Sequence, residues 1–245
     1  MADREPAASS AALAQHDEVH DAGFGDRLNW LRAGVLGAND GIVSTAGLVI
    51  GVAAATTSRG AVLTAGLAGL VAGAMSMAVG EYVSVSTQRD TEQALIAKEV
   101  RELAEEPEAE LAELAAIYEG KGLSPDLAHR VAVQLTEHDA LGAHAEAELG
   151  IDPDNLTNPW HAAWASMLAF TLGALLPLVA ILLPPLSWRV PVTVLAVAVA
   201  LAGTGILSAR LGDADARRAT VRVLVGGLLA MAVTYGIGSV VGTHV

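Results

Sequence analysis

Residues 36–51, LGANDGIVSTAGLVIG, have the composition of the middle of a hydrophobic helix, yet they contain a carboxylate, Asp40. They belong to a longer apolar segment, Leu28–Ala55, and about 20 apolar residues are enough to cross a lipid bilayer as a helix. A charged side chain at the bilayer centre costs at least about 2.5–3.5 kcal/mol, so an acid there is a functional candidate by default. The stretch therefore predicts a membrane-spanning helix that carries a functional carboxylate.

The rest of the chain contains four more segments of this kind. Hydrophobic residues make up 53% of the 245 residues, and the mean hydropathy is +0.47, which is too apolar for an ordinary soluble domain. The absence of cysteine excludes disulfides, thiolate zinc sites and thiol redox chemistry. We expect an all-α membrane protein with five transmembrane helices, at Leu28–Ala55, Ala61–Val85, His161–Leu183, Val190–Leu211 and Val221–Val241.

An acidic block separates the second and third apolar segments. Residues 89–159 contain seventeen acidic and five basic residues, so they carry −12 of the net charge of −13. Their pattern predicts a helical insert of three helices: a continuation of the second span, a short helix that ends at Gly120, and a third from Ser124 to Gly150. Such a surface repels nucleic acid and attracts cations. The predicted domains are a polar tail (1–27), spans 1 and 2 (28–88), the acidic metal-binding insert (89–159) and spans 3 to 5 (160–245).

Arginines near the span ends predict the orientation, because basic residues concentrate on the cytoplasmic side. With the N-terminus and residues 89–159 in the cytoplasm and the C-terminus outside, only Arg59 and Arg189 lie on the outer side. The other flanking arginines are then cytoplasmic: Arg27, Arg32, Arg89, Arg210, Arg217, Arg218 and Arg222.

Paired glutamates in the insert form a candidate metal site. Glutamates three residues apart share a helix face, and Pro107 lets two such helices fold against each other. On the third helix, steps of seven and four residues predict a further shared face. Carboxylates with one imidazole suit Fe²⁺ or Mn²⁺, although glutamate-rich helices are often only solvated surface. The candidate ligands are Glu99, Glu102, Glu110, Glu113, Glu137, His144 and Glu148.

A second candidate site lies in the membrane. Met77 and Glu81 stand one turn apart in the second span, and a methionine sulfur tolerates Fe²⁺ but binds Mg²⁺ or Ca²⁺ poorly; core packing is the alternative role for Met77. With Asp40 they form a predicted transport path for protons and metal ions. One carboxylate and one thioether cannot satisfy a divalent cation, so we expect a two-fold homodimer that doubles the ligands.

Glycine pairs with small-xxx-small spacing permit close helix approach in such a membrane protein: Gly37/Gly41, Gly47/Gly51 and Gly69/Gly73. In the N-terminal tail, His16 and His20 stand one helical turn apart, and whether they contact metal is left open.

Three stretches together resemble the vacuolar iron transporter family: LRAGVLGANDGIVSTAGLVIGV (31–52), GAMSMAVGEYVSVSTQRD (73–90) and PEAELAELAAIYEGKGLSPDLAHRVAVQLTEHDALGAHAEAELGI (107–151). The resemblance extends from Leu31 to Val245. It implies a dimer of five-span subunits that moves Fe²⁺, and often Mn²⁺, out of the cytoplasm by proton antiport, with no prosthetic group. It also implies that Asp40 and Met77 line the translocation site. The metal-gathering ligands that it implies are Glu99, Glu102, Glu110, Glu113 and Glu148.

One departure concerns the last helix of the insert, where His144 and Ala145 occupy positions at which some members of the family carry methionines. The loss of soft ligands there puts a strict Fe²⁺ preference in question. We expect a metal exporter, not an enzyme, in a bacterial-type plasma membrane. The alternatives are a membrane-anchored ferroxidase, which would not need Asp40 in the membrane, and a metal-binding membrane protein without transport, which leaves Asp40 and Met77 without a role.

Overall fold

A computed structural model describes residues 24–212 and 214–243 of the chain. This part contains helices and no strand, and five of the helices are long and apolar enough to cross a membrane. The expected all-α multi-pass membrane fold is therefore confirmed. His16 and His20 lie outside the described residues. The elements are α2 (Phe24–Ala55), α3 (Arg59–Glu105), α4 (Pro107–Gly120), α5 (Pro125–His144), a short π-helix (Ala145–Leu149), α6 (Pro159–Leu182), α7 (Arg189–Leu211) and α8 (Ala216–Gly242).

Helix α2 is the centre of the membrane bundle, since it packs against α3, α6, α7 and α8. Its residues Ala46, Val49 and Ile50 are almost completely buried. Small residues let the neighbouring backbones approach closely, as is usual between membrane helices. A side chain added at Gly41 would collide with the Phe170 backbone of α6, and one added at Gly238 of α8 would collide with the Gly51 backbone. These contacts fix the positions of α6 and α8 against α2.

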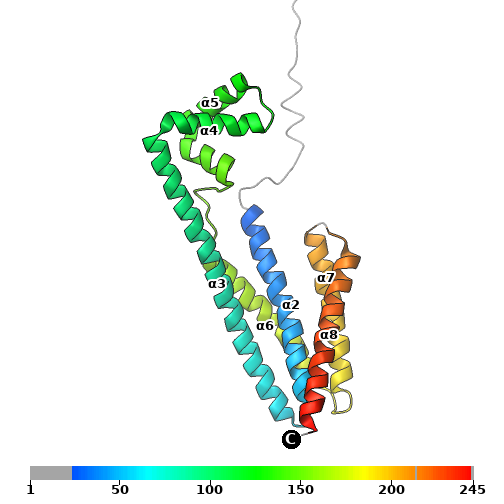
Figure 1. Ribbon diagram of the computed structural model, residues 1–245. Coiled ribbons are helices and arrows are strands. Elements are labelled where there is room, and N and C mark those ends of the chain that lie inside the picture. Colours follow the sequence, from blue (N-terminus) through cyan, green and yellow to red (C-terminus); the bar gives the residue numbers. More distant parts are fainter. Residues whose placement is uncertain (1–23, 213, 244–245) are drawn as a thin grey trace, which may run out of the picture.

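Helix α3 connects the bundle with the insert. Its 47 residues correspond to about 70 Å at 1.5 Å per residue. The helix runs from the end of the bundle where α8 ends to α4 and α5 (Figure 1). The Ser58 side chain caps its start by accepting the Ala61 N–H at 3.2 Å. The helix ends at Glu105, two residues before Pro107, because the next residue, Glu106, has a φ of −134° that is not helical.

The first turns of α2 and the insert lie at one end of the bundle, and the end of α8 lies at the other (Figure 1). This is the arrangement that five consecutive crossings give. The assignment of the insert end to the cytoplasm remains a prediction.

Residues 89–159 contain the end of α3, then α4, α5 and the π-helix. Leu114, Ala115 and Ala132 form a small apolar core between α4 and α5. The third helix differs from the expected single helix over 124–150, because it is interrupted at Asp139 (φ −157°, ψ 93°). The Asp139 carboxylate accepts the Gly142 N–H at 3.0 Å, as a helix N-cap does. A new helical segment therefore begins there and ends in the π-helix.

Candidate functional site

His144 is the centre of a buried polar cluster in the insert. It lies at the end of α5 with no exposed surface, between Glu99 of α3 and Glu110 of α4, which are 2% and 6% exposed. Its Nδ1 lies 3.1 Å from Glu99 Oε1 and 3.5 Å from Glu110 Oε2. The cluster thus adds polar contacts among the three helices of the insert, beside the apolar core between α4 and α5.

Hydrogen bonding does not satisfy the buried atoms of this cluster. The short distance between His144 and Glu99 lacks hydrogen-bond geometry, so both ring nitrogens of His144 and Oε1 of Glu99 have no hydrogen-bond partner among the described residues. Buried polar side-chain atoms nearly always have a partner. An imidazole nitrogen and carboxylate oxygens that converge without bonding one another are suited to ligate a cation.

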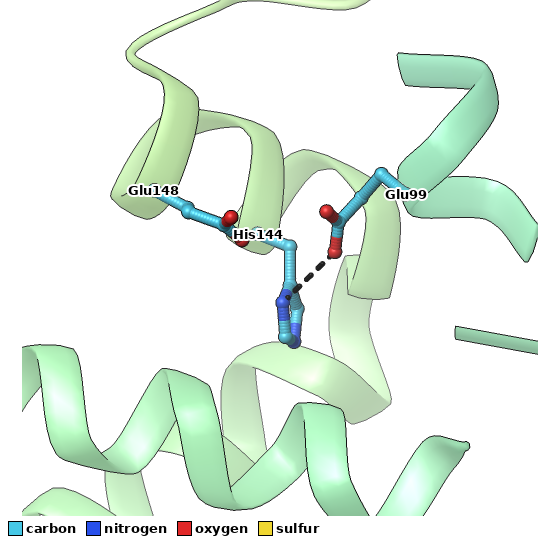
Figure 2. A group of neighbouring side chains, drawn as sticks. All are labelled: Glu99, His144 and Glu148. Atoms are coloured by element: carbon cyan, nitrogen blue, oxygen red, sulfur yellow. Dashed lines mark ion pairs between the residues drawn. The ribbon is translucent and has the colours of Figure 1, made fainter. Parts of the chain in front are cut away.

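Glu148 completes a group that can hold a metal ion. One ligand atom each of Glu99, His144 and Glu148 lies within 4.8 Å of the others. Figure 2 shows that Glu99 and Glu148 reach toward the imidazole from two different segments of the chain. Glu148 is exposed and lies in the π-helix, an element that is frequent at functional sites. The group therefore has two buried ligands and one ligand open to solvent.

The carboxylates of the cluster repel one another. Burial raises the pKa of Glu99 to about 7, and the negative charges of neighbouring glutamates add to the effect. Burial likewise raises the pKa of Glu110, and its proximity to Glu113 adds to that rise, while His144 opposes it. A bound divalent cation would relieve both the desolvation and the repulsion. The glutamates that act on Glu99 are, in order, Glu148, Glu110, Glu102 and Glu113.

The structure thus brings most of the predicted insert ligands together. Glu113 is exposed and Glu102 half-buried at the margin of the cluster, and Glu102 forms an ion pair with Lys98 at 2.7 Å. Glu137 is exposed on α5, before the interruption at Asp139. The seven-residue step from Glu137 to His144 therefore does not run along one continuous helix, and none of the contacts described for the cluster includes Glu137.

A second site lies in the membrane bundle, where a cavity of about 200 Å³ opens between α2, α3 and α6. Asp40 of α2 and Met77 of α3 both line it, so the structure brings these two predicted residues together. The Phe170 ring of α6 also lines the cavity and packs against Gly73, where an added side chain would collide with the ring. The other lining residues are Ser44, Thr45, Leu48, Gly69 and Ser76.

The structure adds three hydroxyl side chains that the sequence reasoning did not select. Ser44, Thr45 and Ser76 line the cavity, and their signal in the sequence was proximity to Asp40 and Met77 within apolar segments. Glu81, the third predicted path residue, is half-buried on α3 and is not among the lining residues. It lies one turn beyond Met77, in the direction of the insert.

Comparison with known proteins gives a consistent result over almost the whole chain. A family model described as the VIT family matches residues 31–239. The vacuolar iron transporter of Acanthamoeba castellanii is 44% identical over 222 residues, covering 90% of this chain and 82% of the relative. Vacuolar iron transporter homolog 1 of Oryza sativa subsp. japonica is 42% identical over 219 residues, 89% of this chain and 76% of the relative.

Vacuolar iron transporter homolog 3 of Arabidopsis thaliana is 38% identical over 231 residues, 94% of this chain and 92% of the relative. The range that the family model matches contains both the membrane cavity and the cluster around His144.

Proposed function

We propose, from the premise that this chain belongs to the VIT family, that it carries Fe²⁺ and Mn²⁺ across a membrane in exchange for protons. The cavity between α2, α3 and α6 carries this proposal, because it holds a carboxylate and a thioether within the membrane bundle. Asp40 is a hard oxygen ligand and Met77 a soft sulfur ligand. Fe²⁺ accepts both kinds, whereas Mg²⁺ and Ca²⁺ prefer oxygen alone.

The insert is proposed to collect metal for this cavity. The buried group of Glu99, Glu110 and His144 needs a cation, and the surrounding acidic surface raises the local cation concentration. Met77 and Glu99 lie on the same helix, about 33 Å apart along its axis at 1.5 Å per residue. Glu81 is one turn from Met77 on the insert side, where it can receive an ion before the cavity does.

Asp40 is proposed to alternate between a metal ion and a proton. A bare carboxylate in an apolar bundle is costly, so either cation stabilises it and each displaces the other. One cavity offers too few ligands for a divalent ion, and we propose that a two-fold dimer brings a second Asp40 and Met77 to the path. The N-terminus and residues 89–159 are proposed to lie in the cytoplasm of a plasma membrane, the C-terminus outside, and metal to leave the cytoplasm.

Reconstituted vesicles test this function. Purified protein is inserted into liposomes with the insert outward, and uptake of Fe²⁺, Mn²⁺, Co²⁺ and Zn²⁺ is followed with and without a proton gradient, acidic inside. We expect uptake of Fe²⁺ and Mn²⁺, stimulated by the gradient and accompanied by proton release from the vesicles. Vesicles that take up neither metal would refute the proposal.

Two variants link the transport to the cavity. Asp40→Asn mimics the protonated carboxylate permanently, so it should insert normally but transport neither metal nor protons. Asp154→Asn, an exposed acid in the segment between the π-helix and α6, serves as the control and should transport like the wild type. Wild-type rates in Asp40→Asn would show that this carboxylate does not couple the two fluxes.

A further inference from the structure

Thr45 has a buried hydroxyl group that the proposed transport path does not yet use. The residue is 2% exposed, and its Oγ1 has no hydrogen-bond partner among the described residues. A buried polar group without a partner loses the hydrogen bonds that water gave it in the unfolded chain, so such groups are rare in native proteins.

Several helical threonines of this chain make a hydrogen bond to their own backbone that Thr45 does not make. In a helix, a threonine hydroxyl ordinarily donates to the carbonyl four residues before it. Thr193, which is fully buried, donates in this way to the Arg189 carbonyl at 2.7 Å. The same bond is made by Thr87, Thr91, Thr171 and Thr234. For Thr45 the corresponding acceptor is the Gly41 carbonyl, and this bond is not formed. Thr136 and Thr220 also have no partner for Oγ1 among the described residues, but neither lines the cavity that Thr45 lines.

Thr45 lines the same cavity as Asp40 and Met77. The neighbouring Ser44 also lines it, but its hydroxyl donates to the Asp40 carbonyl at 2.6 Å and is exposed. Of these two adjacent hydroxyls, the buried one is therefore the one left without a protein partner. It lies about 7.5 Å beyond Asp40 along α2, away from the insert, at 1.5 Å per residue.

We propose that the Thr45 hydroxyl is a further ion-binding residue of the cavity, an uncharged oxygen ligand for the divalent ion beyond Asp40. The inference rests on the proposed transport function and extends it. A divalent ion held by one carboxylate and one thioether has open coordination positions, and a hydroxyl oxygen suits the harder ions such as Mn²⁺. Because it is neutral, Thr45 can bind the ion without holding it as strongly as a second carboxylate would.

Matched substitutions at Thr45 separate the effect of its hydroxyl group on transport from the effect of its side-chain shape. Thr45→Val keeps the branched side chain and removes the oxygen, and Thr45→Ser keeps the oxygen and removes the methyl group. Mn²⁺ uptake into proton-gradient vesicles is measured over a range of Mn²⁺ concentrations. We expect Thr45→Val to raise KM for Mn²⁺ by about tenfold, the order expected for one lost interaction with a charged group. Thr45→Ser should stay within about threefold of the wild type.

Thr193→Val is the control, because it removes a buried hydroxyl that is bonded to its own helix on α7 and does not line the cavity. It should leave KM unchanged. Thermal unfolding of each variant in detergent verifies that the protein is folded. An unchanged KM in folded Thr45→Val, or equally raised values in Thr45→Val and Thr45→Ser, would overturn the role of the hydroxyl. Absence of transport by the wild type would instead refute the underlying function.

Discussion

Nδ1 of His144 lies 3.1 Å from Oε1 of Glu99, and both side chains are withdrawn from water, yet no hydrogen bond joins them. Each comes from a different helix, so the contact closes the insert around an unsatisfied polar centre. Such a centre destabilises the metal-free protein, and a cation that binds there reverses the effect. The insert should therefore respond to pH and to metal in linked ways.

The metal-free protein should lose stability as pH rises from about 4.5 to about 7. The carboxyl group of Glu99 has a pKa of about 7 in the folded protein, against an ordinary value of 4.5. Between these pH values the folded state holds more protons than the unfolded state, so raising the pH favours unfolding. Hydrogen exchange of α4 and α5 in the full-length protein with a chelator present measures this change.

Glu99→Gln is the control for this pH dependence, because an amide cannot titrate. Its α4 and α5 should show a weaker change in protection over the same pH range. If wild type and Glu99→Gln changed in parallel, another group would be responsible.

The buried glutamates of the cluster should matter more for metal binding than Glu137, the exposed glutamate on α5. Glu99→Gln should weaken Mn²⁺ binding to the full-length protein by at least about tenfold, since loss of groups around a metal typically costs about 10–100-fold in affinity. Glu137→Gln should have no effect, because Glu137 is exposed and lies before the interruption at Asp139. Titration calorimetry at pH 7.5 compares them, and equal affinities would favour the solvated-surface interpretation.

The sequence predicted the five spans well because a bilayer requires about 20 apolar residues and leaves few alternatives. It also predicted that the second span continues as a helix, and α3 extends without interruption to Glu105. It did not predict the break at Asp139 or the π-helix that follows. Both depend on local contacts, namely the carboxylate that caps Gly142 and the packing around His144, rather than on helix propensity.

For the insert site, the three-residue spacing predicted that the glutamate pairs face one space, but it could not rank them. Glu99 and Glu102 are equivalent in the pattern, and only the packing of α4 and α5 makes Glu99 buried and leaves Glu102 beside Lys98. In the membrane, the rarity of charge made Asp40 conspicuous. Thr45 was not conspicuous in the sequence, since the hydroxyl of a threonine in an apolar helix ordinarily forms a hydrogen bond with its own backbone.

Close contact between α2 and α6 should make Gly41 intolerant of substitution. A methyl group there would collide with the Phe170 backbone, which cannot move independently of α6. Gly41→Ala should lower the free energy of unfolding by about 1–3 kcal/mol or more, as overpacking does. Gly226→Ala in α8 is the control, since among the described residues nothing outside its own stretch of helix lies within 4 Å of the added group. Thermal unfolding in detergent measures both, and equal melting temperatures would contradict this packing.

Arg189 should stabilise the end of the bundle that faces away from the insert. It is 5% exposed at the start of α7, and its guanidinium donates to the carbonyl groups of Ala53 and Thr56 at the end of α2. The last carbonyls of a helix lack partners within it, and cations are favoured there. Hydrogen bonds from a charged group contribute about 1.5–3 kcal/mol, so Arg189→Met should lower the melting temperature clearly.

Arg59→Met provides the matched comparison, because Arg59 also donates to a backbone carbonyl, that of Pro184 at 2.8 Å, but is exposed. Its loss should change the free energy of unfolding by less than about 1 kcal/mol, since water replaces the bond. Both variants should keep wild-type affinity for Mn²⁺ at the insert, because the affected end of the bundle lies opposite α4 and α5 (Figure 1). An equal loss of stability in the two variants would show that burial does not strengthen the Arg189 bonds.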